Sequence, residues 1–455
     1  MSEEIISALA TAWGESGISV VRLSGEGSLA LADKIFRSRH PLAWYPPRHM
    51  ALGKLCAANG QEYDEVLAVH FMEGSSYTGE ESVEIHCHGG ILPAQMCIEE
   101  LCSIGARIAM PGEFTRRAFV NGRIDLSQAE AVLGIIKARS DEALRASLRT
   151  LQGGFTEEIK KFLDELTLLA AQLEVNLDFP EEGEGLLPET EFIAKLKKLI
   201  SDGESLFARC RSGLILREGI RVAIIGRPNV GKSSLLNILL REERAIVTPI
   251  PGTTRDRIEE TFVHKGVPVR IIDTAGIRDT SDEIESIGVK RSINAMNEAD
   301  LCIWVLDSAE ILSDDDLLLG HKASALNHII VLNKSDLHQK TTSDDLKKIF
   351  PASTILYISA LKSDGIDKLR DMIVEYACGG TVSSDAYGVT NRQMECLKMA
   401  LSSIREAELA IAGKIGDDIA VSCISDARSG LSSLLGTDAT EDLLDVIFST
   451  FCVGK

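Results

Sequence analysis

One stretch in the middle of the chain has the residue types and spacing that bind nucleotide phosphates. Residues 226–233 read Gly-Arg-Pro-Asn-Val-Gly-Lys-Ser, and glycines in such a loop let backbone N–H groups close around phosphate oxygens. Lys232 would reach the β and γ phosphates, and the Ser233 hydroxyl suits a magnesium ligand. An apolar run ends at Ile225 and a helical pattern begins at Ser234, so a helix N-terminus would also face the anion. The stretch therefore predicts a P-loop.

A second group of residues indicates which base is bound. Asn333-Lys334-Ser335-Asp336 follows an apolar run. Asp336 can accept hydrogen bonds from the N1–H and the exocyclic amine of guanine, whereas adenine offers no such pair of donors. Ser359 and Ala360 follow a further apolar run and would contact the base through the backbone. Each motif is weak alone, but their order after a P-loop predicts a guanine-specific GTPase.

The region between these motifs should sense the γ phosphate. Asp273-Thr274-Ala275-Gly276 ends an apolar run, where a carboxylate can hold the magnesium shell and a glycine N–H can contact the phosphate. In Gly252-Thr253-Thr254-Arg255-Asp256 we expect Thr254 to bind magnesium and the γ phosphate. Ile277 stands where Ras-like enzymes carry the glutamine that orients water, so hydrolysis must be organised differently. The candidate groups are Asn229, Arg255, Arg278 and the acidic run Asp282-Glu283-Ile284-Glu285, with a solvated switch segment as the alternative for each.

Composition limits the class of protein. A chain of 455 residues exceeds what one core usually organises, so we expect two or three domains. No apolar run reaches the roughly 18 to 20 residues that span a bilayer. Ten scattered cysteines without a Cys-x-x-Cys pair, and Glu3 and Glu4 at the start, favour a cytoplasmic protein without a signal peptide.

The net charge of −20 argues against a surface that binds nucleic acid unaided, because that affinity comes from Lys and Arg. Any activity on RNA would therefore require a local basic patch on this chain or a partner protein that binds the RNA.

Apolar runs separated by helical patterns should position the nucleotide motifs. They lie at 222–225, 269–272, 301–306, 329–332 and 355–358. Buried strands that alternate with helices indicate a largely parallel sheet.

The stretches on either side of this α/β region have different patterns of apolar and polar residues. Residues 1–118 mix β-like runs, at 17–23 and 65–71, with helical segments. Ser127-Gln128-Ala129-Glu130 has the form of a capping box at a helix start. Helical periodicity continues to about 177, breaks at 178–183, resumes to about 216, and returns from 391 to about 450.

The resulting fold class is multidomain: an α+β N-terminal domain, a discontinuous all-α domain, and an α/β Ras-like P-loop GTPase domain inserted into it. The expected boundaries are 1–118 for the N-terminal domain, 119–217 and 379–455 for the two halves of the helical domain, and 218–378 for the GTPase domain.

Several motifs outside the nucleotide site resemble one family. They are Pro111-Gly112-Glu113-Phe114-Thr115-Arg116-Arg117-Ala118-Phe119 with Asn121 and Asp125-Leu126, Leu216-Arg217-Glu218-Gly219, Gly252-Thr253-Thr254-Arg255-Asp256, and the terminal Phe451-Cys452-Val453-Gly454-Lys455. Together they resemble the tRNA-modification GTPases of the MnmE (TrmE) family over nearly the whole chain. Val453 departs slightly, since the family usually has Ile there.

The resemblance implies a GTPase that is stimulated by K⁺ bound in the nucleotide site with GTP and Mg²⁺. By position, Asn229 with Thr248, Ile250 and Thr253 matches the potassium site, Ser233 and Thr254 match the magnesium ligands, and Glu285 matches the carboxylate that orders the catalytic water. Lys232 and Asn229 would join Glu285 in catalysis. The nucleotide contacts expected in total are Asn229, Val230, Gly231, Lys232, Ser233, Ser234, Thr248, Pro249, Ile250, Pro251, Gly252, Thr253, Thr254, Asp273, Thr274, Ala275, Gly276, Asn333, Lys334, Asp336, Ser359 and Ala360.

The resemblance also implies a one-carbon chemistry. Family members bind a tetrahydrofolate derivative in the N-terminal domain, which also forms the homodimer. They work with the flavin-containing MnmG, in a heterotetramer, on carbon 5 of the wobble uridine of certain tRNAs. Arg22, Glu84, Arg123 and Lys455 match the folate contacts, and a folate glutamate tail would suit the two arginines. Cys452 matches a cysteine considered catalytic, with a packed thiol as the alternative.

Two other functions remain open from the residues: a regulatory GTPase switch that binds ribosomes or other RNA, and a nucleotide-binding scaffold with negligible turnover. A zinc site at His86-Cys87-His88 is not expected, because alternate residues of a strand point to opposite faces. Cys97 and Cys102 lie on an expected helix and should be core residues.

Overall fold

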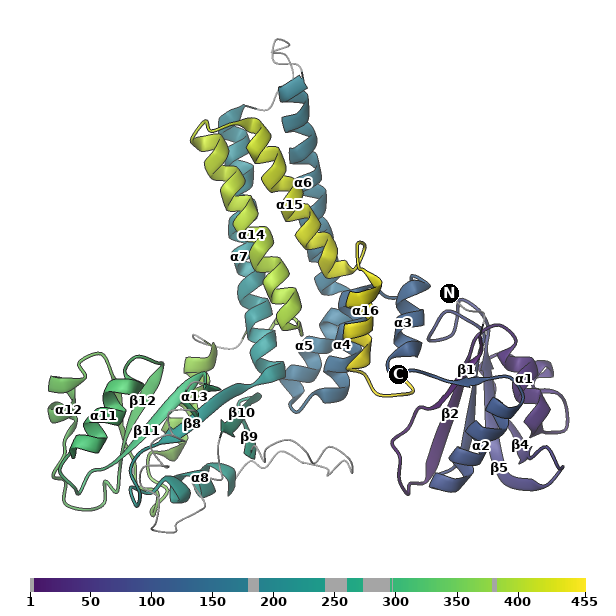
Figure 1. Cartoon of the computed structure of the whole chain (residues 1–455), viewed down its shortest axis with the longest axis horizontal. Helices are drawn as coiled ribbons and strands as arrows, with labels where there is room; N and C mark the ends of the chain where they lie inside the picture. The colour runs from purple at the N-terminus through teal and green to yellow at the C-terminus, as the bar shows by residue number, and fades with distance from the viewer. Residues whose placement is uncertain (1–3, 179–187, 242–259, 273–294, 297, 379–382) are drawn as a thin grey trace. The chain divides into compact units, whose positions relative to one another are not determined.

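The computed structural model describes residues 4–178, 188–241, 260–272, 295–296, 298–378 and 383–455 (Figure 1). Contacts divide the chain into two compact units. The first combines Met1–Leu133, Thr156–Glu174 and Val421–Lys455, and the second combines Gly134–Phe155 and Val175–Ala420. Each unit therefore contains segments that are far apart in the sequence.

A seven-stranded sheet forms the N-terminal part of the first unit, in the order β3-β4-β5-β6-β2-β1-β7. Neighbouring strands pair antiparallel except β1 with β7. Helices α1 and α2 contribute to one core with the strands, which matches the expected α+β domain and its β-like runs. The bounds are β1 Ile6–Leu9, β2 Ile18–Ser24, α1 Ser28–Ile35, β3 Phe36–Arg37, η1 Leu42–Trp44, β4 Ala51–Cys56, β5 Glu62–Phe71, β6 Ser82–His88, α2 Ile91–Ser103 and β7 Arg107–Ile108.

Helices that lie far apart in the sequence complete this unit. The C-terminal helix α16 (Glu441–Ser449) packs against α3 (Glu113–Val120), and Arg116 Nη1 of α3 lies 2.8 Å from Asp445 Oδ1. Leu126 and Leu133 of α4 (Leu126–Lys137) share an apolar cluster with Phe448. Parts of α6 (Gly154–Asp178) and α15 (Asp417–Leu435) also belong to this unit.

The start of α4 differs from the expectation. The reciprocal cap is formed by Asp125 and Gln128: Gln128 N donates to Asp125 Oδ1, and Asp125 N donates to Gln128 Oε1, each over 2.9 Å. The Ser127 hydroxyl instead donates to the Leu434 carbonyl oxygen. The predicted cap at Ser127 and Glu130 was therefore wrong by two residues, because a tertiary hydrogen bond uses the serine.

The second unit contains a six-stranded sheet in the order β13-β12-β11-β8-β10-β9. All pairs are parallel except the edge pair of β9 with β10, so the expected parallel sheet is confirmed. Strand β9 was not predicted. The bounds are β8 Ile220–Ile225, α8 Lys232–Arg241, β9 Glu260–His264, β10 Val267–Ile272, β11 Leu301–Asp307, α11 Asp314–Ala323, β12 His328–Asn333, α12 Ser343–Ile349, β13 Thr354–Tyr357 and α13 Ile366–Cys378.

Helices on both sides of this sheet in the sequence pack together. Helix α7 (Glu189–Glu218) precedes the sheet and α14 (Asn391–Ala412) follows it, and the two lie side by side (Figure 1). Helix α5 (Asp141–Leu151) also packs on α7. The α/β domain is thus inserted into a discontinuous helical domain, as the sequence predicts. Among the described helices, none is long and apolar enough to cross a membrane.

Candidate functional site

The loop between β8 and α8 has a backbone that only certain residues tolerate. Gly226 has a φ of 146° and Gly231 a φ of 100°, both in the region that favours glycine. A Cβ on Gly226 would lie 2.3 Å from the Val305 carbonyl oxygen. Asn229 is also left-handed, with a φ of 64°. This backbone, which ends at the first turn of a helix, fits the phosphate cradle predicted for residues 226–233.

Lys232 starts helix α8 and its side chain turns back over the loop. Its Nζ donates to the carbonyl oxygens of Gly226 and Arg227, over 2.8 and 2.7 Å. Burial lowers the pKa of Lys232 to about 8. An ammonium group with this cost of burial would be stabilised by neighbouring phosphates.

The guanine motif is joined to the P-loop by one buried amide. Asn333 ends β12 and is 2 % exposed. Its Nδ2 donates to the Val230 carbonyl oxygen over 2.9 Å, and its Oδ1 accepts from Ala360 N over 3.0 Å. Three segments that the sequence singled out separately are therefore held together at this residue.

The two charged residues of the motif are also oriented. Asp336 Oδ1 accepts from the Ser359 hydroxyl over 2.7 Å, and this bond lowers the pKa of Asp336. An ionised carboxylate here can accept from guanine. Lys334, with a φ of 60°, pairs through Nζ with the buried Asp307 at the end of β11.

Other predicted residues of the nucleotide site lie outside the described residues, so their positions remain predictions. They are Thr248, Pro249, Ile250, Pro251, Gly252, Thr253, Thr254, Arg255, Asp273, Thr274, Ala275, Gly276, Ile277, Arg278 and Glu285.

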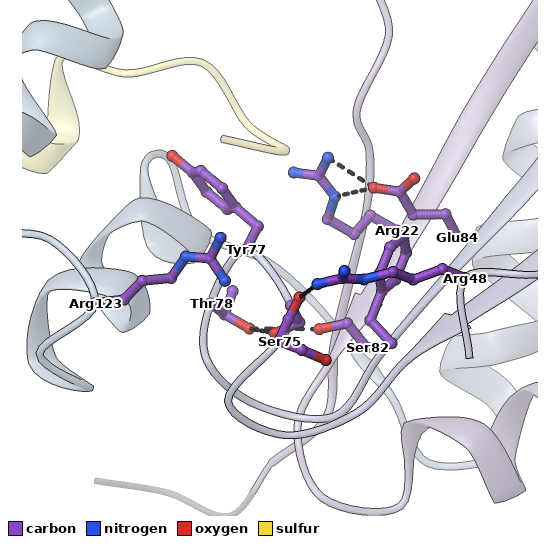
Figure 2. Close-up of a pocket in the computed structure, with 10 residues that line it drawn as sticks. Arg22, Arg48, Ser75, Tyr77, Thr78, Ser82, Glu84 and Arg123 are labelled. Carbon is purple, nitrogen blue, oxygen red and sulfur yellow. Dashed lines mark hydrogen bonds and ion pairs between the residues drawn. The ribbon is translucent and has the colours of Figure 1, made fainter. Parts of the chain in front are cut away.

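A second candidate site is a cavity of about 260 Å³ in the N-terminal domain (Figure 2). Arg22 from β2, Glu84 from β6 and Arg123 line it together. Arg22 Nη2 lies 2.8 Å from Glu84 Oε1, and the Arg22 guanidinium also lies over the Tyr77 ring, 5.5 Å from its centroid. The neighbouring His86 imidazole and Arg22 hold the pKa of Glu84 below its usual range. Arg22, Glu84 and Arg123 can thus offer one carboxylate and two guanidinium groups to a ligand in this cavity.

The C-terminal residues lie near this cavity. Burial and the nearby Arg22 lower the pKa of Lys455, while Glu84 opposes that shift. Gly454 has a φ of 93°, and a Cβ there would lie 2.1 Å from the Leu9 carbonyl oxygen. The structure therefore brings all four predicted folate residues into one neighbourhood. Cys452 is exposed.

Sequence reasoning missed several residues that line the cavity. Arg48, with a φ of 64°, donates from Nη2 to the Ser75 carbonyl oxygen over 3.0 Å. Tyr77 and Thr78 come from the turn between β5 and β6. The only local signal was the run of polar residues at 73–82, which does not distinguish a site from an ordinary loop.

His88 and Cys87 are neighbours in the sequence but lie in different surroundings. His88 is exposed and its Nδ1 lies 2.5 Å from Asp64 Oδ1. Cys87 is 1 % exposed and belongs to the core with Cys97, as expected for the latter. Cys102 is only partly buried and packs against that core.

Solved structures match part of this chain. The G domain of the Thermotoga maritima FeoB iron transporter is 28% identical and matches 35% of this chain and 98% of its own, with a TM-score of 0.27. Era from Aquifex aeolicus, bound to GDP and AlF4⁻, is 27% identical over 40% of this chain and 66% of its own, with a TM-score of 0.28.

Comparison with families and curated relatives covers the whole chain. The model of the TrmE N-terminus, described as a GTP-binding protein, matches residues 5–123, and that of the MnmE helical domain matches residues 126–452. Proteins named tRNA modification GTPase MnmE from Natranaerobius thermophilus and Clostridioides difficile are each 41% identical and cover 100% of this chain and 100% and 99% of their own. The relative from Aquifex aeolicus is 41% identical over 99% of this chain and 100% of its own. The chain belongs to the MnmE (TrmE) family of tRNA modification GTPases.

Proposed function

We propose that this protein is a potassium-stimulated GTPase that modifies carbon 5 of the wobble uridine of certain tRNAs with a folate one-carbon unit. It would act in the cytoplasm as a homodimer through its N-terminal domain, with an MnmG-like FAD protein as partner. The observation that carries the proposal is the cavity that Arg22, Glu84 and Arg123 share, in a chain that also has a P-loop joined to a guanine motif.

In the nucleotide site the chain's own groups would bind and orient GTP. Backbone N–H groups of the P-loop and Lys232 would hold the phosphates, and Asp336 would hold the base. Ser233 and Thr254 would hold Mg²⁺, while Asn229, Thr248, Ile250 and Thr253 would hold K⁺. Bound K⁺ supplies positive charge where charge builds up on the phosphates. Glu285 would orient water, which Ile277 cannot do.

In the N-terminal cavity, the guanidinium groups of Arg22 and Arg123 would pair with carboxylates of the folate glutamate tail. Glu84, which is kept ionised, can accept from N–H groups of the pterin ring. Lys455 would add a cation from the C-terminus, and Cys452 lies three residues earlier in the chain. A reduced folate in this cavity would supply the one-carbon unit for the modification.

The potassium dependence is tested by GTP hydrolysis in KCl and in NaCl at equal ionic strength. We expect a steep rise in rate in KCl, and loss of most of that rise in Asn229→Ala. Equal rates in both salts would contradict the proposal.

The folate site is tested by titrating the full chain with 5-formyltetrahydrofolate. We expect Arg123→Gln to weaken binding about tenfold, because a charge-assisted bond is lost. Lys34→Gln, a change at an exposed residue on α1, serves as the control. Absence of binding by the unmodified chain would favour the regulatory switch, which gives no reason for folate affinity. Unchanged wobble nucleosides in tRNA from cells without this gene would refute the tRNA role.

A further inference from the structure

One segment of this acidic chain has the opposite charge. Residues 34–61 include five Lys or Arg residues and no Asp or Glu, although the chain as a whole carries a net charge of −20. The central part, residues 37–49, contains Arg37, Arg39 and Arg48, and we refer to it as the basic aromatic segment. A local patch of this kind is what an acidic protein needs in order to bind a polyanion.

The same segment presents an exposed aromatic face. Trp44 is 74% exposed, and its ring stacks on His40 with centroids 5.3 Å apart and an interplanar angle of 11°. Tyr45 stacks in the same way on His49, with centroids 6.0 Å apart. An exposed indole backed by a parallel ring provides a flat surface on which a nucleobase can stack.

The aromatic face is held in place by the fold beneath it. Leu42 is fully buried in the core of the N-terminal sheet, and its N–H donates to Asp33 Oδ1 over 2.8 Å. The Tyr45 carbonyl oxygen lies 2.9 Å from His70 Nε2 of β5. The exposure of Trp44 therefore belongs to an ordered segment, and little additional ordering would be required when a ligand binds.

The cations of the segment face solvent. Arg37 and Arg39 are exposed, and no carboxylate in the described part of the chain forms an ion pair with either. Arg48, at the other end of the segment, lines the cavity that also contains Arg22 and Arg123 (Figure 2). The basic aromatic segment is thus continuous with the edge of the proposed one-carbon site.

We propose that the basic aromatic segment binds single-stranded RNA, with phosphates on Arg37 and Arg39 and one unpaired base stacked on Trp44. This inference rests on the proposed function, because it gives the loop of the tRNA substrate a contact on this chain beside the cavity. Exposed stacked rings together with unpaired guanidinium groups favour an RNA loop over a purely electrostatic partner.

The test is binding of a fluorescein-labelled RNA hairpin with a seven-nucleotide loop to the full chain, followed by anisotropy at several KCl concentrations. We expect Trp44→Ala to raise Kd about tenfold, since stacking of one base is lost, without changing the salt dependence. The double variant Arg37→Gln with Arg39→Gln should reduce the slope of log K against log salt by about 1.4, because two phosphate contacts are lost.

Matched controls separate these effects from general ones. Trp13→Ala removes another exposed tryptophan, and Lys160→Gln with Lys161→Gln removes two exposed charges on α6. We expect both controls to bind the hairpin like the unmodified chain. Thermal unfolding of every variant should be unchanged, since the substituted side chains are exposed.

The outcomes distinguish this inference from the proposed function. Equal hairpin affinity in Trp44→Ala and the unmodified chain, or no binding by the unmodified chain, would overturn the inference while GTP hydrolysis and folate binding continue. A shift of Trp44→Ala from dimer to monomer in sedimentation would assign the segment to contact between two copies and would also overturn it. If the unmodified chain did not bind folate, that result would contradict the proposed function but not this inference.

Discussion

Nucleotide binding should take up a proton at alkaline pH because of Lys232. Burial lowers the pKa of this residue to about 8, so the ammonium group loses its proton earlier than an exposed lysine does. Phosphate oxygens beside Nζ favour the charged form and raise the pKa again. Above pH 8 the bound complex therefore holds more protons at this site than the free protein.

The size of the effect follows from the pKa. With a value of about 8, roughly three quarters of Lys232 is neutral at pH 8.5 and about a quarter at pH 7.5. Calorimetric titration with GDP and Mg²⁺ in two buffers that differ in ionisation enthalpy measures the uptake directly. We expect about 0.7 proton per site at pH 8.5 and about 0.2 at pH 7.5.

Two lysine variants identify the source of the proton. Lys334→Arg changes a cation that already pairs with Asp307, so uptake at pH 8.5 should persist. Lys232→Arg cannot lose a proton in this range, so any nucleotide that it still binds should bind without uptake. Uptake near zero in the unmodified protein at pH 8.5 would refute the argument that burial lowers the pKa of Lys232.

Three substitutions test other parts of the structure. Gly213→Ala should lower the free energy of unfolding by about 3 kcal/mol in a denaturant titration, because its Cβ would lie 1.7 Å from the Tyr387 carbonyl oxygen. As the control, Gly17→Ala should leave the free energy of unfolding unchanged, because its Cβ would meet no atom within 4 Å. Gly454→Ala should weaken 5-formyltetrahydrofolate binding and leave GTP hydrolysis unchanged, because its Cβ would meet a carbonyl oxygen at the end of β1; equal folate affinity would contradict this. Asp336→Asn should lower GTP affinity about a hundredfold and favour xanthosine triphosphate, and an unchanged preference in competition binding would refute the assigned contact.

The P-loop and the guanine motif could be recognised from the sequence because each is short and contiguous. A P-loop needs its glycines and Lys232 within eight residues, and such a motif specifies its own backbone. The parallel sheet was predicted from apolar runs such as 222–225 and 329–332, which are typical of strands buried on both faces and which alternate here with helical patterns. What the motif did not reveal is that the Asn333 side chain joins the P-loop to Ala360, since that depends on strand order.

Local rules failed where tertiary contacts compete with them. Asp125 and Ser127 are both good caps by residue type, and sequence alone does not rank them. The structure selects Asp125, because the Ser127 hydroxyl bonds to Leu434, 307 residues later. Strand β9 was missed because it has one fully buried residue, Phe262, among partly exposed ones, so its apolar signal is weak.

The N-terminal cavity shows most clearly which parts of a site the sequence does not predict. Arg22 and Lys455 lie at opposite ends of the sequence, and no spacing rule joins them; they entered the sequence prediction only through family resemblance. Arg48 had no such support, and an arginine between prolines and a histidine reads as an ordinary surface residue. Its left-handed backbone and its bond to Ser75 bring it to the cavity. A charge of −20 describes the whole chain correctly and yet conceals the local excess of basic residues around Trp44.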